Sequence, residues 1–240
     1  MSGHSKWNNI KRKKEASDAK KANIFSKLGK EITIAVKTGN SGDINVNRKL
    51  KDVVAKAKAQ NMPNDNINRC IQKAIGDTSA ANYEEITYEG FGPCGVSVIV
   101  EALTDNKNRT AGDVRSTFTK RGGNLGTDGS VSYMFDRKGI IVLPKTYDED
   151  MLMTLALDND CLDFVVNDDS YEIYTSYEDF IKMNNVLNEN NITEFIMNET
   201  RYIPQNYISL NDEDKEKIYN LIETLEDLDD VQDVYHNMEE

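Results

Sequence analysis

The stretch GIIVLPKTYDEDMLMTLALDNDCLDFVVNDDSYEIYT, residues 139–175, decides the fold class of this 240-residue chain. Its short β-branched and aromatic runs have the pattern of strands, and the residues between the first two runs repeat apolar positions at helical spacing. Up to residue 203, the predicted elements are strand 139–144, helix 147–158, strand 162–166, strand 171–175, helix 177–190 and strand 193–203. This β-α-β-β-α-β order is typical of a ferredoxin-like unit.

The segments that flank this unit are too short to bury a core alone. Residues 83–121 predict two strands, YEEITYE and GVSVIVEAL, followed by a helix, and residues 212–237 predict one helix and one strand. Because two strands form a stable sheet only with further support, we expect the two segments to pair in one discontinuous domain. Between them, GGNLGTDG is predicted as a loop, and SVSYMF as a strand that joins GIIVLP through the turn DRKG.

The first 80 residues predict helices only, over 17–38, 47–60 and 63–76. The predicted fold class is therefore α+β with three lobes: an N-terminal helical bundle plus two ferredoxin-like α+β domains, one of them discontinuous. The predicted domains are 1–80, the basic N-terminal helical domain; 81–129 with 205–240, the discontinuous α+β domain; and 130–204, the inserted ferredoxin-like domain.

Charge is distributed unevenly between the halves of the chain. The formal net charge is -12, yet residues 1–80 hold 17 Lys+Arg against 7 Asp+Glu, net +10, and residues 81–240 hold 12 against 34, net -22. An asymmetry of this size indicates that one half of the chain binds a polyanion.

Several classes of protein are disfavoured. No run of about 18 apolar residues is present to span a membrane, and no apolar stretch follows the first positive charges as in a secretory signal. Cys70, Cys94 and Cys161 stand far apart, and the histidines are His4 and His236, so we expect neither a disulfide framework nor a metal site. We predict a cytoplasmic, non-enzymatic protein without a cofactor, and no pattern specifies its oligomeric state.

The N-terminal arm, SGHSKWNNIKRKK, carries five basic residues and one tryptophan without an acid. Lysine and arginine neutralise phosphates, and the ring of Trp7 offers a face on which a base can stack. The alternative for Trp7 is packing against the helical bundle. Together with a stripe of lysines on the first helix, the arm favours nucleic-acid binding. The second helix also turns cations outward, namely Arg48, Lys49, Lys51, Lys56 and Lys58.

Two glycine-rich segments have competing interpretations. GFGPCG, residues 90–95, fits the dinucleotide motif literally, but a strand follows it instead of a helix, which favours a hairpin loop. NRTAGDVRSTFTKRGGNLG, residues 108–126, sets arginines beside a glycine-rich loop that can approach phosphate. The same residues are also those that helix C-termini collect, which is the favoured interpretation. The candidate nucleic-acid-binding residues are His4, Lys6, Trp7, Lys11, Arg12, Lys13, Lys14, Lys20, Lys27, Lys30, Lys37, Arg109, Arg115 and Arg121.

Long motifs throughout the chain resemble the YebC/PmpR family: SGHSKWNNIKRKKEASDAKKANIFSKLGKEI, AKAQNMPNDNINRCIQKA, YEEITYEGFGPCGVSVIVEALTDNKNRTAGDVRSTFTKRGGNLGTDGSVSYMF and DDVQDVYHNM. The family's GHSKW segment corresponds to residues 3–7, and Cys94 departs from a pattern in which glycine is more common, which leaves the fine geometry of that loop open. The resemblance implies three domains, one helical and two α+β. Most members are described as transcriptional regulators that bind promoter DNA. A mitochondrial relative is a translational activator, and bacterial relatives are also described as factors for ribosomes stalled at proline-rich sequences.

The sequence thus predicts a nucleic-acid-binding regulator, with transcription through promoter DNA as the first hypothesis. A translation factor that binds ribosomal RNA is the alternative, because no helix-turn-helix with base-reading residues is evident and an irregular arm suits folded RNA. A third hypothesis is an interaction module whose acidic lobes bind a basic protein while the N-terminal charge only solvates.

Overall fold

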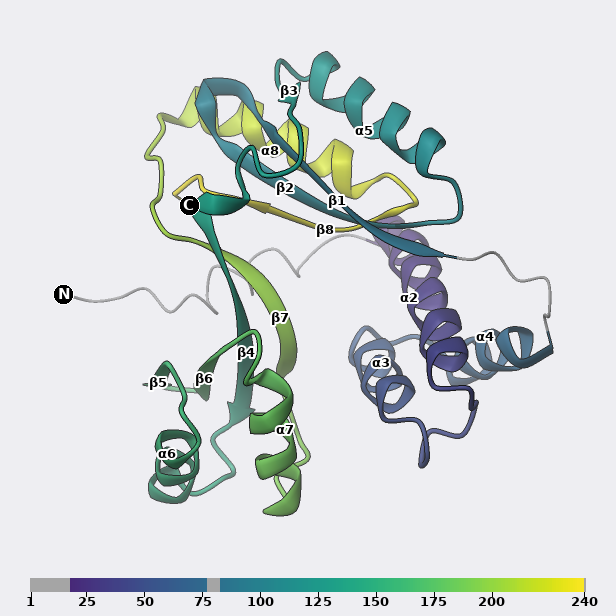
Figure 1. Cartoon of the computed structure of the whole chain (residues 1–240), viewed down its shortest axis with the longest axis vertical. Coiled ribbons are helices and arrows are strands. Elements are labelled where there is room, and N and C mark those ends of the chain that lie inside the picture. The colour runs from purple at the N-terminus through teal and green to yellow at the C-terminus, as the bar shows by residue number, and fades with distance from the viewer. Residues whose placement is uncertain (1–17, 77–82, 240) are drawn as a thin grey trace. The chain divides into compact units, whose positions relative to one another are not determined.

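The structure, a computed structural model, describes residues 18–76 and 83–239, and for residues 18–22 the backbone alone (Figure 1). By their internal contacts these residues form two compact units. One is Ser132–Tyr207, called the inserted lobe below, and the other joins the residues up to Val131 with Ile208–Glu239. The second unit contains a helical lobe, residues 18–76, and a sheet lobe, residues 83–131 with 208–239.

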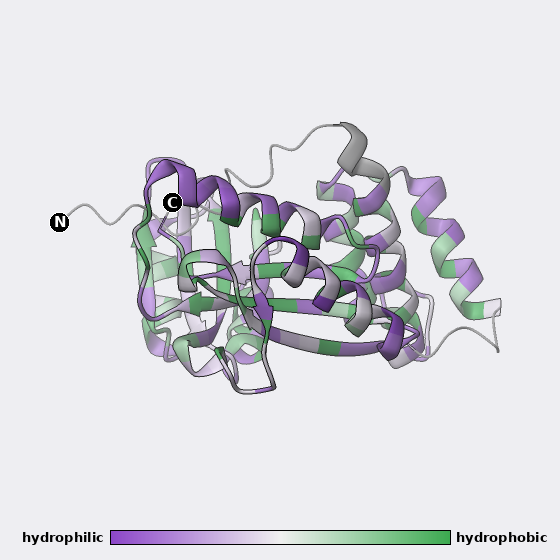
Figure 2. Ribbon diagram, turned by 90° about the horizontal axis from the view of Figure 1, so that it is seen from above, coloured by the Kyte–Doolittle hydropathy of each residue, from purple (hydrophilic) through white to green (hydrophobic). Residues whose placement is uncertain are grey.

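The helical lobe consists of helices α2 (Asp18–Thr38), α3 (Arg48–Ala59) and α4 (Asn64–Gly76). Each helix turns one apolar stripe inward, and hydrophobic and hydrophilic residues alternate along the ribbons in Figure 2. Asn47 joins the first two helices: its side-chain oxygen accepts from the amide of Leu50 as the N-cap of α3, and its Nδ2 donates to the carbonyls of Ala35 and Ser41, each at 2.8 Å. This one buried side chain fixes the turn between α2 and α3.

The sheet lobe is a four-stranded sheet with two helices. Its elements are β1 (Glu84–Phe91), β2 (Ser97–Thr104), α5 (Lys107–Lys120), β3 (Asn124–Leu125), α8 (Asp212–Glu226) and β8 (Val231–His236). All pairings are antiparallel in the order β3-β1-β2-β8, so the C-terminal strand lies beside β2. Val98, Val100 and Val234 of the sheet pack against Phe118 of α5 and Leu221 of α8.

The inserted lobe has the chain order predicted for residues 139–203. Its elements are β4 (Phe135–Pro144), α6 (Glu149–Asp158), β5 (Asp163–Val166), β6 (Ser170–Ser176), α7 (Phe180–Glu189) and β7 (Met197–Pro204). The antiparallel strand order β5-β6-β4-β7 is that of a ferredoxin-like sheet. Ile141 and Ile173 on one face of the sheet pack against Leu152 of α6 and Leu187 of α7.

The fold class is confirmed: the protein is α+β, with a helical lobe and two lobes built on antiparallel sheets, one of them discontinuous. The sheet lobe shares the two-layer plan of the inserted lobe, but its chain order begins with the hairpin β1–β2. That hairpin is the predicted outcome for GFGPCG. The boundaries proposed for the three domains stay a prediction.

Two local predictions are wrong. SVSYMF and GIIVLP are not two strands joined by the turn DRKG, because β4 runs unbroken from Phe135 to Pro144. Residues 135–142 pair with β7 on one side and residues 138–144 pair with β6 on the other, so backbone bonds override the turn propensity of DRKG. The loop GGNLGTDG contains the short strand β3, which pairs with the end of β1.

Cys94 gives a first testable prediction, because its φ of 59° lies in a region that L-residues rarely adopt. In the described ranges, the other non-glycine residues with positive φ are asparagine or aspartate, which tolerate it better: Asn40, Asn61, Asp160 and Asn191. We expect Cys94→Gly to raise the melting temperature, by roughly 1–3 °C, because the relieved strain slightly exceeds the added unfolded-state entropy. Cys94→Ala keeps the strain and is the control, and an equal rise in both variants would contradict this explanation.

Candidate nucleic-acid interface

The outward side of α3 carries a row of cations on each flank. The exposed basic residues, called the α3 basic face below, are Arg48, Lys49, Lys51, Lys56 and Lys58. Residues seven positions apart lie on the same side of a helix, two turns or about 10.5 Å apart. Lys51 and Lys58 therefore form one row and Lys49 and Lys56 the other, one on each flank of the core residues Leu50, Val54 and Ala57.

Among the residues that the structure describes, most of this charge is not neutralised. Lys56 forms an ion pair with Glu31 at 3.0 Å, whereas Lys49, Lys51 and Lys58 form no ion pair with any residue that the structure describes. The nearby carboxyl of Asp52 is partly desolvated, and this burial raises its pKa although Arg48 and Lys51 oppose the shift. The α3 basic face thus presents cations to solvent where a polyanion can reach them.

Helix α4 adds a smaller basic patch. Arg69 and Lys73 are both exposed and stand four positions apart, so they lie on one side of the helix. Within residues 18–76 and 83–239 neither has an ion-pair partner. The inward side of α4, with Ile67, Ile71 and Ala74, belongs to the core of the helical lobe.

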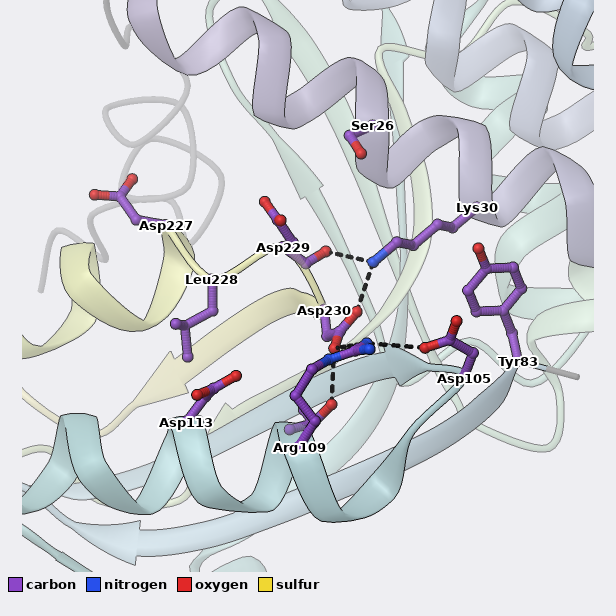
Figure 3. Close-up of a pocket in the computed structure, with 11 residues that line it drawn as sticks. Ser26, Lys30, Tyr83, Asp105, Arg109, Asp113, Asp227, Leu228, Asp229 and Asp230 are labelled. Atoms are coloured by element: carbon purple, nitrogen blue, oxygen red, sulfur yellow. Dashed lines mark hydrogen bonds and ion pairs between the residues drawn. The ribbon is translucent and has the colours of Figure 1, made fainter. Parts of the chain in front are cut away.

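Two members of the predicted lysine stripe of α2, Lys27 and Lys30, make contacts within the protein instead. Asn23, Lys27 and Lys30, called the anchor stripe below, lie on one side of α2 and face the segment between α8 and β8 (Figure 3 shows the Lys30 end). Nδ2 of Asn23 donates to the carbonyl of Asp227 at 3.2 Å, and Nζ of Lys27 donates to the carbonyl of Glu226 at 2.7 Å. Lys27 and Lys30 therefore do not form the free outward stripe that was predicted.

The physical reason lies at the end of α8. The last carbonyls of a helix lack partners within it and carry partial negative charge, and the last turn of α8 contains no basic residue. Asn23 and Lys27 of α2 supply the missing donors. Burial lowers the pKa of Lys27, and the carboxylates of Glu226 and Asp233 oppose that shift.

Asp230 is the centre of a hydrogen-bond network that includes Lys30 (Figure 3). Its Oδ1 accepts from Nζ of Lys30 at 2.7 Å, and its Oδ2 accepts from Arg109 at 2.7 Å, Thr110 at 2.8 Å and Thr104 at 3.2 Å. Burial by itself would raise the pKa of Asp230, but the bonds from Lys30, Arg109 and Thr110 outweigh it and lower that pKa to about 2. This carboxylate is therefore ionised at every physiological pH.

Arg109 was also predicted to bind nucleic acid, and its guanidinium is occupied in the same network. It donates to Asp105 at 2.8 Å as well as to Asp230, and these two carboxylates raise its pKa. A cavity of about 550 Å³ adjoins the network, and its lining holds five aspartates, Asp105, Asp113, Asp227, Asp229 and Asp230. Because the two cations in that lining are already bonded to Asp230, the cavity repels a phosphate.

The glycine-rich loop after α5 holds an anion of its own. The carboxylate of Glu89 on β1 accepts from the amides of Gly129 at 2.9 Å and Val131 at 2.8 Å. These amides are therefore not available to phosphate, and Gly122, with φ of 78°, follows α5 as an ordinary helix-ending glycine. The contacts support the structural interpretation of this segment, while Arg115 and Arg121 remain exposed.

The other predicted residues are placed only in part. Lys20 belongs to α2, but its side chain is not described, and Lys37 is half-buried. The candidates of the arm lie outside the described residues: His4, Lys6, Trp7, Lys11, Arg12, Lys13 and Lys14.

Several exposed cations are not among the candidates predicted from the sequence. Lys49, Lys51 and Lys58 are predicted to face outward without belonging to that set, and Arg69 and Lys73 are absent from it as well. The signal available in the sequence was their spacing of seven or four positions on helices with an apolar opposite side. Nothing comparable singles out Lys27 and Lys30 as internal contacts, because their partners stand about 200 positions away.

Two classes of site receive no support from the described part of the chain. Over residues 18–76 and 83–239, no three side chains of the His, Cys, Asp and Glu types gather where they could hold a metal ion. None of the helices in these ranges is long and apolar enough to cross a membrane.

Comparison with known proteins gives a consistent result. Residues 5–77 match the family described as TACO1/YebC protein N-terminal domain, and residues 83–238 match TACO1/YebC second and third domain. A "Probable transcriptional regulatory protein" of Acetivibrio thermocellus is 55% identical over 240 residues, 99% of this chain and 98% of that protein. A protein of the same description from Clostridium beijerinckii is 52% identical over 100% of this chain and 97% of its own length.

A solved structure also matches. The conserved hypothetical protein Aq1575 from Aquifex aeolicus superposes with a TM-score of 0.75 at 38% identity, covering 92% of this chain and 91% of that one. With matches along nearly the whole length in sequence and in structure, the chain belongs to the TACO1/YebC family.

Proposed function

We propose that this protein is a regulator of transcription that binds DNA through its basic N-terminal half, with the α3 basic face and the N-terminal arm contacting phosphates. The observation that carries the proposal is the exposure of Lys49, Lys51 and Lys58 without an internal ion-pair partner among the described residues. The names of the relatives, probable transcriptional regulatory proteins, support the regulatory role.

The mode of recognition proposed is contact with the phosphate backbone. The outward side of α3 carries lysine and arginine but none of the asparagine or glutamine side chains that pair with adenine edges. Phosphate contacts fix the position of a protein on nucleic acid without specifying sequence. The acidic sheet lobe is repelled by the same polyanion, so the protein docks in one orientation.

A second candidate is a translation factor that binds structured ribosomal RNA in the cytoplasm. The same absence of adenine-reading side chains on α3 favours it, because folded RNA is recognised largely by shape and backbone. Both candidates use the same residues and differ in the nucleic acid they bind.

The test is a binding titration of the full chain with promoter duplex and with a ribosomal RNA fragment, each between about 50 and 200 mM salt. For the double variant Lys51→Gln and Lys58→Gln, we expect affinity for the true target to fall about tenfold and the salt slope to decrease by about 2, since two phosphate contacts are lost. The target bound more tightly at the higher salt concentration decides between promoter and ribosome.

The matched control removes two lysines from the sheet lobe, Lys120→Gln and Lys215→Gln, with the same change in net charge. The proposal requires that this control bind as the wild type does. Equal losses in both double variants would mean that only net charge matters, and a salt-independent affinity would favour the third hypothesis, a protein-interaction module.

A further inference from the structure

We infer that the anchor stripe and Asp230 form a permanent anchor between the helical lobe and the sheet lobe, and that Asn23, Lys27, Lys30 and Asp230 position the α3 basic face without touching nucleic acid. The anchor itself is independent of what the protein binds. Its positioning role rests on the function proposed above.

The geometry of the contacts distinguishes an anchor from a loose surface pairing. Surface ion pairs contribute little because water screens them, but the side chains of Lys30 and Asp230 are only 14% and 10% exposed. Nζ of Lys30 makes two bonds of 2.7 Å, one to Asp230 and one to the carbonyl of Asp229. Among the described residues, four of the five hydrogen bonds from Asn23, Lys27 and Lys30 to this segment end on backbone carbonyls, those of Glu226, Asp227 and Asp229.

The helical lobe gains from this support because it is small. Its core is one cluster formed by three helices, and domains of about 60 residues bury too little surface to be more than marginally stable. At the other side of the contact, the end of α8 depends on α2 for its donors, since α8 has no cation in its last turn. Each lobe therefore satisfies polar groups that the other leaves without partners.

A nucleic acid is a poor competitor for these lysines. Drawing Lys30 away would leave a buried carboxylate and a carbonyl without their strongest donor, which costs far more than an exposed phosphate contact returns. Asp230 also remains fixed by Arg109 and Thr110 on α5, so it cannot follow the lysine. The aspartates around the adjoining cavity repel an approaching phosphate.

The consequence is preorganisation. If the helical lobe is docked in nearly every molecule, no binding energy is spent on ordering it. If a variant leaves it docked in about one molecule in five, the apparent dissociation constant rises about fivefold.

A binding measurement on Asp230→Asn tests the positioning role, because the two explanations predict changes in affinity of opposite sign. Removing a negative charge should leave polyanion binding unchanged or tighten it if long-range electrostatics alone acts. The anchor predicts the reverse, a loss of about fivefold with the nucleic acid preferred in the titration above. The matched control is Asp229→Asn, which removes the same charge from the preceding residue but keeps the carbonyl that Lys30 uses, and it should not weaken binding. Unchanged or tighter binding by Asp230→Asn would overturn the positioning role.

A distance measurement tests the anchor without reference to function. Spin labels at two exposed positions, Gln72→Cys on α4 and Lys120→Cys on α5, in a chain with its three natural cysteines replaced by alanine, report the separation of the lobes. We expect one narrow distance distribution at about 50 and about 300 mM salt, unchanged by saturating nucleic acid, and a broad one in Asp230→Asn. If that variant does not fold, Lys30→Met is used instead, since it removes both bonds of the ammonium group.

Two results would overturn the anchor. One is a broad distribution in the wild type, and the other is a distribution that nucleic acid converts to that of Asp230→Asn, which would mean that phosphate competes for the lysines. If the protein binds no nucleic acid at all, the proposed function fails, while the distances measured in its absence still decide whether the anchor exists.

Discussion

Deletion of residues 1–14 is expected to weaken nucleic-acid binding by at least about 100-fold near physiological salt. This deletion removes five cations and Trp7. Each phosphate contact contributes about 0.9 to the salt slope on duplex DNA, so the slope should decrease by roughly 4 to 5, and loss of one stacked base costs about 1–3 kcal/mol more. Fluorescence anisotropy with the full chain and the truncated chain, at several salt concentrations, measures both quantities.

Two further variants separate charge from stacking. A chain with its five basic arm residues changed to glutamine keeps Trp7 and should lose most of the salt slope. Trp7→Ala alone should lose affinity at constant slope, because stacking releases no counterions. A truncated protein that binds both promoter DNA and ribosomal RNA as tightly as the intact one would show that the arm has another role.

Phe118→Ala is expected to lower the free energy of unfolding of the sheet lobe by about 3–5 kcal/mol, because Phe118 is fully buried in the cluster between the sheet and α5. The ring also occupies space that two glycines leave open: a Cβ added at Gly90 would stand 2.9 Å from Phe118, and one at Gly123 would stand 3.1 Å from it. Because the backbone at Gly90 and Gly123 is held in place by the sheet and the loop, it cannot move in to fill the cavity that the missing ring leaves. Chemical denaturation followed by fluorescence and circular dichroism measures the loss.

The control for this prediction is Tyr133→Ala, the loss of an aromatic ring that is 69% exposed, for which we expect almost no change. We also expect the melting temperature of Phe118→Ala to fall by about 10 °C, given roughly 2–4 °C per kcal/mol for a protein of this size. A loss below about 1 kcal/mol would indicate that the surrounding side chains collapse into the space after all.

The sequence predicted the fold where one periodicity dominates a segment. The apolar stripes of α3 and α4 and the alternation in the inserted lobe were sufficient for the three-lobe architecture, and the leftover α8 and β8 required a partner in the segment around β1 and β2. DRKG was misread because turn propensity is a local signal, while the bonds that keep residues 136–139 extended come from β6 and β7, which follow later in the chain.

The same difference between local and long-range signals applies to the candidate site. Exposed cations on α3 follow from helical spacing alone, since a side opposite the core faces solvent. The internal role of Lys27 and Lys30 does not, because it depends on the end of α8 arriving beside α2. Glu89 is comparable: nothing local marks it as the ligand of the loop amides at Gly129 and Val131. Charge counts predict which segment is basic, but only tertiary structure shows which cations remain available.

The position of β8 beside β2 has a consequence for synthesis on the ribosome. The strand that completes the sheet of the sheet lobe leaves the exit tunnel more than 100 residues after β2, the strand with which it pairs. The helical lobe and the inserted lobe have all their own elements by residue 207 and can fold during translation. The hairpin of β1 and β2 has only α5 to cover its apolar side until α8 and β8 appear, so a nascent chain stopped before residue 212 should be a target for chaperones.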